Sequence, residues 1–143
     1  MRLYFDTAYL AKCYWNEPDG KLVRDLAQTV EGLFSSAICI AEMACLAHRK
    51  AREGPVTAAD AIVRRDLFLD DLKTGVITAT PVTERLLRLV ETTTRTLPPS
   101  CYLRTFDALH LVTAADTGFA EIWTNDRHML AAAPHFGLAG RSV

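Results

Sequence analysis

Short β-forming runs alternate with longer helical segments along the chain, and this alternation constrains the fold more than any other feature. The hydrophobic pattern predicts strands at residues 2–5, 32–36, 76–78, 121–124 and 136–138. It predicts helices at residues 7–14, 21–30, 38–52, 104–117 and 126–133, with two more that begin after Thr57 and Thr83. Strands separated by helices imply a parallel sheet covered on both faces. We therefore expect an α/β fold with three layers, α/β/α, around a short parallel sheet of four to five strands.

The helix after Thr57 has a clear start and a predicted buried side. Thr57 and Asp60 resemble a capping box, and Gly75 provides the stop signal. Its apolar residues predict the side that faces the core: Ile62, Leu67, Leu69 and Leu72.

Length and charge limit the classes of protein that fit. The 143 residues contain no repeat and no low-complexity linker, so we expect one domain at residues 1–143. Apolar runs are too short to cross a bilayer, and an acid soon after the N-terminus is unlike a secretory signal. Sixteen Lys and Arg against 17 Asp and Glu give a net charge of −1, which argues against a surface that is basic throughout. A local nucleic-acid site is still compatible, because a bound divalent cation can supply positive charge.

The four cysteines do not form a recognisable metal or redox motif. They show neither C-x-x-C pairing nor zinc-ribbon spacing, so a thiol-redox function lacks its motif. We expect them to be reduced and buried as small hydrophobic side chains. They are Cys13, Cys39, Cys45 and Cys101.

Four carboxylates lie in apolar stretches where a core is expected. Asp6 and Asp126 follow the ends of predicted strands, Asp107 lies in the first turn of a helix, and Glu42 lies about one turn into another. Open parallel sheets bind ligands at the carboxyl ends of their strands, where the strand order reverses. Four converging acids would repel one another unless protons or cations intervene. Oxygen ligands without His or Cys suit Mg²⁺ or Mn²⁺ better than Zn²⁺.

Each acid also has a purely structural interpretation. A single carboxylate can cap a helix or form half of an ion pair, and for Asp107 and Asp126 taken alone capping is as good an explanation as function. Glu42, in the middle of an apolar helix, fits this alternative least well. The candidate ion-pair partners are Arg2, Lys12, Arg49, Arg104 and Arg127.

The four acids, in their local motifs, resemble PIN-domain ribonucleases. Residues 3–12 (LYFDTAYLAK) are similar to the first strand and first acid of that family, and Ser36 followed by Ala41-Glu42 is similar to the second. Residues 104–111 (RTFDALHL) resemble the helix of the third acid, and Thr124-Asn125-Asp126 resembles the T-x-D element of the fourth. The motifs occur in the family's order between residues 3 and 138.

Length and motif style look most like the VapC-type toxin of a VapBC toxin–antitoxin pair. The resemblance implies a cytoplasmic, Mg²⁺- or Mn²⁺-dependent endoribonuclease that forms a homodimer and is neutralised by a small cognate antitoxin. It implies that Asp6 and Asp107 hold the ion directly, with Asp126 and Glu42 completing its shell through water or binding a second ion. Water would then attack the RNA phosphodiester in line and leave 5′-phosphate and 3′-hydroxyl ends.

Further residues are predicted to support this site. Thr7 and Thr124 would donate hydrogen bonds that orient carboxylates, and Asn125 would help to hold water or phosphate. Arg49 and Lys12 are the candidate contacts to RNA, although Arg49 also fits a cation at a helix C-terminus.

Other interpretations of these residues fit the sequence less well than the nuclease hypothesis. His110 invites a dyad with Asp107, but metal-activated water needs no imidazole base, so we expect a structural role. Asp116 is predicted to face solvent. A D-x-D phosphatase would need an acid at Ala8, and a receiver domain would need an acidic pair where Thr7 follows Asp6. The main alternative is a catalytically inert PIN-like module that binds RNA or a partner.

Overall fold

The computed structural model describes all 143 residues as five strands, seven α-helices and one 3-10 helix. The strands are β1 (Arg2–Tyr4), β2 (Gly32–Ser36), β3 (Ile77–Thr80), β4 (Glu121–Trp123) and β5 (Ala139–Arg141). The first four helices are α1 (Thr7–Tyr14), α2 (Gly20–Gln28), α3 (Cys39–Glu53) and α4 (Ala58–Thr74). The others are α5 (Glu84–Thr94), α6 (Thr105–Asp116), α7 (Arg127–Ala132) and the 3-10 helix η1 (Ala133–Phe136).

All strand pairs are parallel, as the alternating pattern predicts. β1, β2 and β3 form one ladder in that order, and β4 pairs with β5 in a second. A single parallel bridge between Phe5 and Trp123 joins the two ladders. The order across the sheet is therefore β3-β2-β1-β4-β5, and it reverses between β1 and β4. This is the position at which α/β sheets place their ligands.

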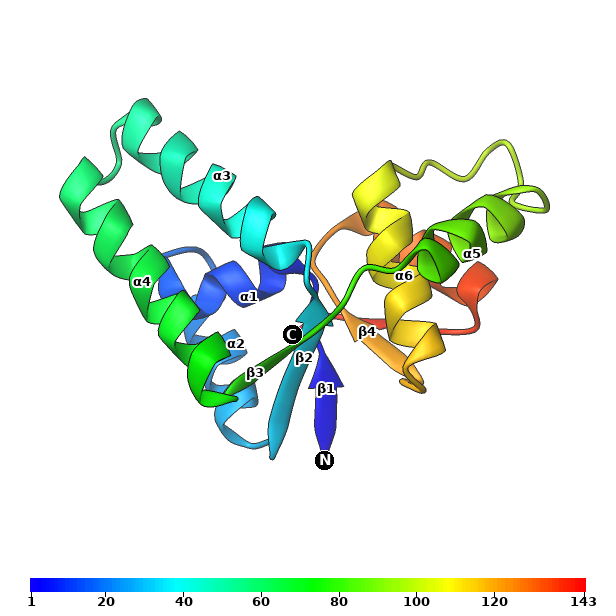
Figure 1. The fold of residues 1–143 in the computed structure, drawn as a ribbon, viewed down its shortest axis with the longest axis horizontal. Helices are drawn as coiled ribbons and strands as arrows, with labels where there is room; N and C mark the ends of the chain where they lie inside the picture. The colour runs from blue at the N-terminus through cyan, green and yellow to red at the C-terminus, as the bar shows by residue number, and fades with distance from the viewer.

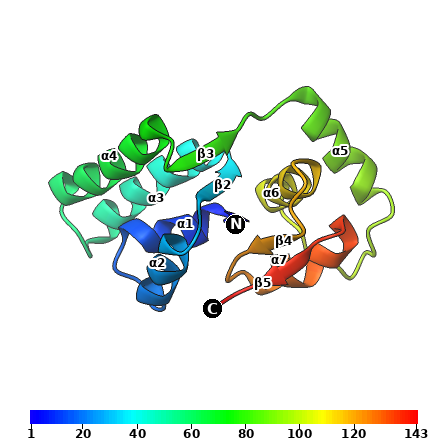
Figure 2. The same ribbon diagram turned by 90° about the horizontal axis from the view of Figure 1, so that it is seen from below.

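Helices cover both faces of the sheet, which confirms the predicted three layers. Figures 1 and 2 show α1 to α4 on one side and α5 and α6 on the other. The two faces of β1 explain this arrangement, because successive side chains of a strand point to opposite faces. Leu3 and Phe5 pack in the core under α1 to α4, whereas Tyr4 packs in the core under α5 and α6.

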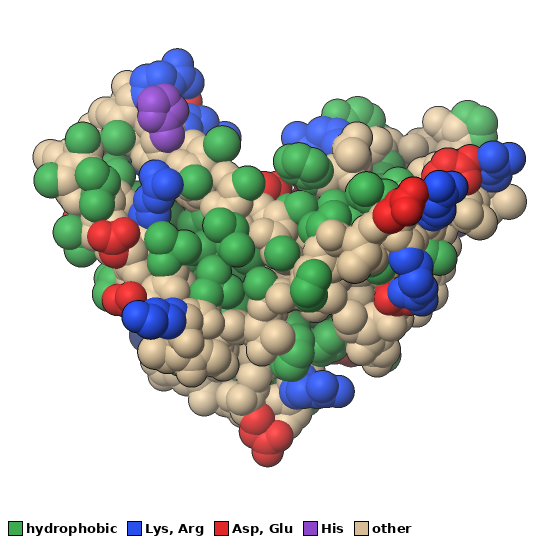
Figure 3. All heavy atoms as spheres, viewed as in Figure 1, with side chains coloured by type: hydrophobic (Ala, Val, Ile, Leu, Met, Phe, Trp, Pro, Cys, Tyr) green, Lys and Arg blue, Asp and Glu red, His purple; other side chains and the backbone are tan.

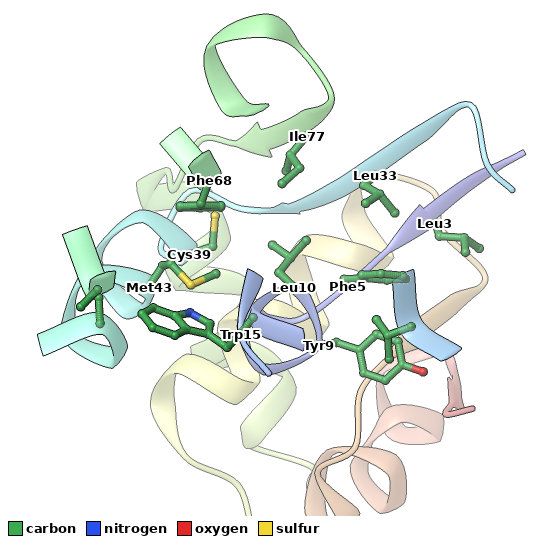
Figure 4. Close-up of a cluster of buried hydrophobic side chains, with 14 residues drawn as sticks. Leu3, Phe5, Tyr9, Leu10, Trp15, Leu33, Cys39, Met43, Phe68 and Ile77 are labelled. Atoms are coloured by element: carbon green, nitrogen blue, oxygen red, sulfur yellow. The ribbon is translucent and has the colours of Figure 1, made fainter. Parts of the chain in front are cut away.

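The core between the sheet and helices α1 to α4 is filled by large side chains from several elements. Trp15, at the end of α1, and Phe68 of α4 are almost completely buried there. Figure 4 shows how these side chains meet between the sheet and the helices. Its labelled members are Leu3, Phe5, Tyr9, Leu10, Trp15, Leu33, Cys39, Met43, Phe68 and Ile77.

Local capping fixes several helix starts. Thr57 caps α4 by accepting a hydrogen bond from the amide of Asp60, as predicted, and Thr83 caps α5 in the same way. Asp6 and Asp126 cap α1 and α7 with their side chains. The capping interpretation of these two acids is therefore correct, and it leaves their remaining oxygen lone pairs for other partners.

Three predictions about burial and strand position were wrong. On α4 the buried residues are Ala61 and Phe68, because only one narrow side of this helix packs on α3 and β3. Leu72 packs partly buried against the core as predicted, whereas Ile62, Leu67 and Leu69 are exposed. The last strand is β5, not residues 136–138, since residues 133–136 form a 3-10 helix that ends at Gly137 with φ 75°.

The third correction concerns the thiols. All four cysteines are free, as predicted, but only Cys39 is fully buried and Cys45 is exposed. Cys45 lies on the side of α3 that faces away from the core.

No helix of the structure has the length and apolar character needed to cross a bilayer.

Candidate active site

A groove of about 960 Å³ opens between α3 and α6, beside the start of α1. Figure 3 shows this hollow between the two arms of the molecule, with an acidic side chain at its floor and basic side chains on both walls. Two of the four predicted acids, Glu42 and Asp107, line it together with the two arginines Arg49 and Arg104. The other lining residues are Thr7, Ala8, Cys45, Leu46, Thr105 and Phe106.

Asp6 is a buried carboxylate at the end of β1, only 4% exposed. Its Oδ1 accepts a hydrogen bond from the amide of Tyr9 at 2.8 Å, and its Oδ2 accepts one from the Thr124 hydroxyl at 2.5 Å. No basic side chain forms an ion pair with it. Burial raises the pKa of Asp6, and the nearby charge of Glu42 adds to this effect, although His110, Thr124 and Tyr9 oppose it. The site therefore favours either a proton or a cation at Asp6.

Glu42 is held by two side chains from other elements. Its Oε1 accepts hydrogen bonds from the Thr7 hydroxyl at 2.7 Å and from Nε2 of His110 at 2.9 Å. Burial pushes the pKa of Glu42 upward, but these two hydrogen bonds and the attraction of His110 and Arg104 outweigh burial and lower it. Glu42 is thus stabilised as a carboxylate pointing into the groove, whereas Asp6 is not.

His110 is almost completely buried, and both of its ring nitrogens have partners. Nδ1 lies 3.0 Å from the Tyr4 hydroxyl, and Nε2 lies 3.1 Å from the Thr7 hydroxyl as well as near Glu42. The residue is held by its surroundings, as predicted, and its contact is with Glu42 rather than with Asp107.

Asp107 and Asp126 share one arginine. Nε of Arg104 donates to Oδ2 of Asp107 at 3.0 Å, and its Nη2 donates to Oδ2 of Asp126 at 3.4 Å. Oδ1 of Asp126 is occupied by the amides of His128 and Met129 at the start of α7. The ion-pair interpretation of Arg104 is therefore correct for both acids.

Thr124 connects the ends of β1 and β4. Its hydroxyl donates to Asp6 and accepts a hydrogen bond from the amide of Asp126 at 3.0 Å. The amide of Asp6 in turn donates to the carbonyl of Trp123 at 3.2 Å. The hydrogen bonds expected of Thr7 and Thr124 are both present. Those of Thr124 tie Asp6 and Asp126 to one point of the sheet, and that of Thr7 holds Glu42.

The remaining predicted residues lie in different places. Arg49 lines the groove, and Asn125 accepts a hydrogen bond from the Ser142 hydroxyl. Lys12 is 8% exposed, and its amine donates to the carbonyl of Pro18 at 2.7 Å, close to Glu17. It is not among the residues that line the groove, so the prediction that it contacts RNA finds no support in its position.

The four carboxylates have the chemistry of ligands for a hard divalent ion, but their oxygens do not converge on one common position. No three Asp, Glu, His or Cys side chains gather closely enough to hold a metal as they stand. The buried Asp6 lacks a cationic partner, and the guanidinium of Arg104 supplies positive charge to Asp107 and Asp126. Carboxylate oxygens are the ligands that Mg²⁺ and Mn²⁺ prefer, and a divalent ion could replace the positive charge that Arg104 provides.

Sequence reasoning did not foresee two contributors to this site. Tyr4 gave no signal, because its role depends on a side chain 106 residues away. Arg104 was considered only as one of several possible ion-pair partners. Its spacing of three residues from Asp107 was the available signal, since side chains at i and i+3 are neighbours at a helix surface.

A comparison with protein families gives one match, to the model described as PIN domain, and it covers residues 3–134. This range contains all four acids. No curated protein gives a significant match to the chain.

Proposed function

Since the chain belongs to the PIN domain family, whose members are generally nucleases that use divalent metal ions, we propose that it is a Mg²⁺- or Mn²⁺-dependent endoribonuclease. The observation that carries this proposal is the connected set of four acids at the reversal of the strand order. Thr124 links Asp6 with Asp126, Arg104 links Asp126 with Asp107, and Thr7, next to Asp6, holds Glu42.

In the proposed site Asp6 and Asp107 would hold the ion, and Asp126 and Glu42 would complete its shell. Such an ion lowers the pKa of water and neutralises charge that develops on the scissile phosphate. Thr124 fixes one oxygen of Asp6, and Thr7 and His110 fix Glu42, so that the carboxylates need little reorganisation. Hydrolysis would leave 5′-phosphate and 3′-hydroxyl ends.

The groove supplies the space and charge for an RNA strand. Arg49 on α3 and Arg104 at the start of α6 both line it, so each is available to an RNA phosphate. Phe106, half exposed beside Asp107, offers an aromatic face on which a base can stack.

We propose the biological role from the length of the chain and the style of its motifs, which resemble those of VapC-type toxins. The protein would act on RNA in the cytoplasm as a homodimer, and a small cognate antitoxin would neutralise it. Expression of the chain alone should then arrest growth, and co-expression of a cognate antitoxin should restore it. Growth without arrest, with the protein present and active on RNA in vitro, would contradict the toxin role only.

The test of the enzymatic proposal compares wild type with Asp6→Asn on purified RNA. Asn keeps an oxygen that can accept the Tyr9 amide and cap α1, so the variant should fold and yet lose cleavage in Mg²⁺ or Mn²⁺. Chelation of the metal should abolish wild-type cleavage. Undiminished cleavage by the folded variant would contradict the proposal.

An inert RNA- or partner-binding module is the second candidate, favoured by the ion pairs that Arg104 makes with two of the acids. Calorimetric titration with Mn²⁺ separates the two functions. The nuclease should bind Mn²⁺, and Asp107→Asn should weaken this binding about 10- to 100-fold. An inert module gives no reason for Asp107 to affect Mn²⁺ binding.

A further inference from the structure

Arg104 covers two of the candidate metal ligands from the solvent side. Its side chain is 63% exposed, whereas the side chains of Asp107 and Asp126 are 14% and 25% exposed. The guanidinium makes one hydrogen bond to each carboxylate rather than two to the same one. Such single contacts from an exposed arginine are weak and can be exchanged without disturbing the core.

The guanidinium also keeps an unused donor. Nε and Nη2 are taken by the two aspartates, but Nη1 donates to no protein group. Arg104 lines the same groove as Arg49 and Glu42. An arginine with a free edge in an open groove has the geometry to bind a phosphate.

The position of Arg104 in α6 argues against a role in the stability of this helix. It occupies the N-cap with extended backbone, and its side chain makes no capping hydrogen bond. A positive charge at a helix N-terminus is unfavourable, and Ser, Thr, Asp or Asn would cap the helix better. A substitution at this position should therefore leave the fold intact.

We infer that Arg104 is a positioning residue that exchanges partners during the reaction. Without a divalent ion it neutralises Asp107 and Asp126; once an ion supplies that charge, Arg104 turns to a phosphate of the RNA in the groove. This inference rests on the proposed nuclease function. It accounts for the position of Arg104 over the carboxylates, its exposure and its free Nη1.

The first test measures Mn²⁺ binding by calorimetry without RNA. Because Arg104 competes with the ion for the two aspartates, Arg104→Ala should bind Mn²⁺ about two- to fivefold more tightly than wild type, the range expected for loss of an exposed ion pair. The matched control is Arg85→Ala, which removes another exposed ion pair to α6, that with Asp116. This control should bind Mn²⁺ like wild type.

The second test measures RNA recognition with and without the ion. In EDTA, Arg104→Ala should weaken binding of a single-stranded RNA less than it does in Mn²⁺, because the aspartates then hold two of the guanidinium nitrogens. In Mn²⁺, Arg104→Ala should raise KM about tenfold with a much smaller change in kcat, as expected for one lost charged hydrogen bond. The dependence of log KM on log salt should be shallower by about 0.7, which corresponds to one phosphate contact with a single strand. Arg104→Lys should recover part of the wild-type KM and part of the wild-type salt dependence.

Three outcomes would overturn the inference. Weaker Mn²⁺ binding by Arg104→Ala would mean that the arginine arranges the ligands for the ion instead of competing with it. If Arg104→Ala left KM and its salt dependence unchanged, Arg104 would not contact RNA. If the variant weakened RNA binding equally in EDTA and in Mn²⁺, Arg104 would not exchange partners. These results leave an active wild type and contradict only the role of Arg104. A wild type that neither binds Mn²⁺ nor cleaves RNA contradicts the proposed function itself, and the inference with it.

Discussion

Nε2 of His110 lies 2.9 Å from Oε1 of Glu42, inside a site where the histidine is 2% exposed. Because the carboxylate can only accept, Nε2 donates in this contact, and Nδ1 lies 3.0 Å from the Tyr4 hydroxyl. The buried side of α6 thus holds a carboxylate that belongs to α3 on the opposite face of the sheet. His110 connects the two faces at the groove.

We expect substitutions of His110 to act through Glu42. His110→Ala should lower kcat or Mn²⁺ affinity about 10- to 100-fold, as is typical when a group that orients a ligand is removed. His110→Gln, whose amide can replace the Nε2 donor, should retain more activity than His110→Asn. Tyr4→Phe removes only the outer hydrogen bond and should have the smaller effect. Equal loss in all variants would indicate a role in packing alone, and steady-state kinetics with Mn²⁺ calorimetry would show it.

Asp6→Asn should stabilise the metal-free protein at neutral pH. The pKa of Asp6 is raised in the folded state, so above its ordinary pKa the folded chain binds more protons than the unfolded chain, and the free energy of unfolding falls as pH rises. The gain should be seen as a higher Tm of the variant at neutral pH. The gain should disappear as pH falls below the ordinary pKa of Asp.

Asp116→Asn is the control of opposite sign for that experiment. Arg85 lowers the pKa of Asp116, so loss of its charge should reduce stability slightly or leave it unchanged. Thermal unfolding in EDTA over a pH series checks both variants. A destabilised Asp6→Asn protein at neutral pH would contradict the electrostatic description of Asp6.

Cys45 should be the first cysteine to react with N-ethylmaleimide at pH 8. It is exposed on the wall of the groove, whereas burial raises the pKa of Cys13 to about 11 and that of Cys39 to about 12. Thiols with such pKa values contain almost no thiolate at this pH. Peptide mass spectrometry identifies the modified residue.

The adduct on Cys45 should obstruct the groove and inhibit RNA cleavage. Cys45→Ala should cleave RNA like wild type and resist this inhibition, because Cys45 has no role in the proposed chemistry. Full activity of the singly modified protein would show that RNA does not pass this wall of α3.

Gly140→Ala should destabilise the fold near β5. A Cβ at this position would lie 2.9 Å from a methyl carbon of Leu130 and 3.0 Å from the Leu130 Cα, too close for a backbone contact to relax cheaply. Overpacking of this kind costs about 1–3 kcal/mol. Ala139→Ser, at an exposed neighbouring position, should change the midpoint of urea unfolding little. Equal stability of the two variants would contradict the close approach of β5 to α7.

The elements that the sequence predicted well are those with local signals. Residues 7–14 and 32–36 match α1 and β2 because Asp6 caps the one and the turn residues around Gly32 begin the other. The buried side of α4 had no local signal, since it depends on which side packs against α3 and β3. The last strand was misplaced for a similar reason, because Gly137 and Gly140 both lie where α7 and η1 return to the sheet.

The site residues could also be predicted only where the signal is local in the sequence. The four acids were recognisable because carboxylates are rare in apolar stretches. The supporting roles of Thr7 and Thr124 could be predicted because these residues lie close to Asp6 and Asp126 in the sequence. The partners Tyr4 and His110 depend on contacts between distant parts of the chain. The local sequence around Lys12 likewise does not show that its amine contacts Pro18 and Glu17.

The hydrogen bond between Thr124 and Asp6 joins residues that are 118 positions apart. β1, the first strand to be synthesised, can pair with its neighbour β4 only after β2 and β3 have been synthesised. A nascent chain therefore cannot assemble the four acids until residues up to Asp126 have left the ribosome. A ribonuclease of the proposed kind, built in this way, would have an incomplete site for most of its own synthesis.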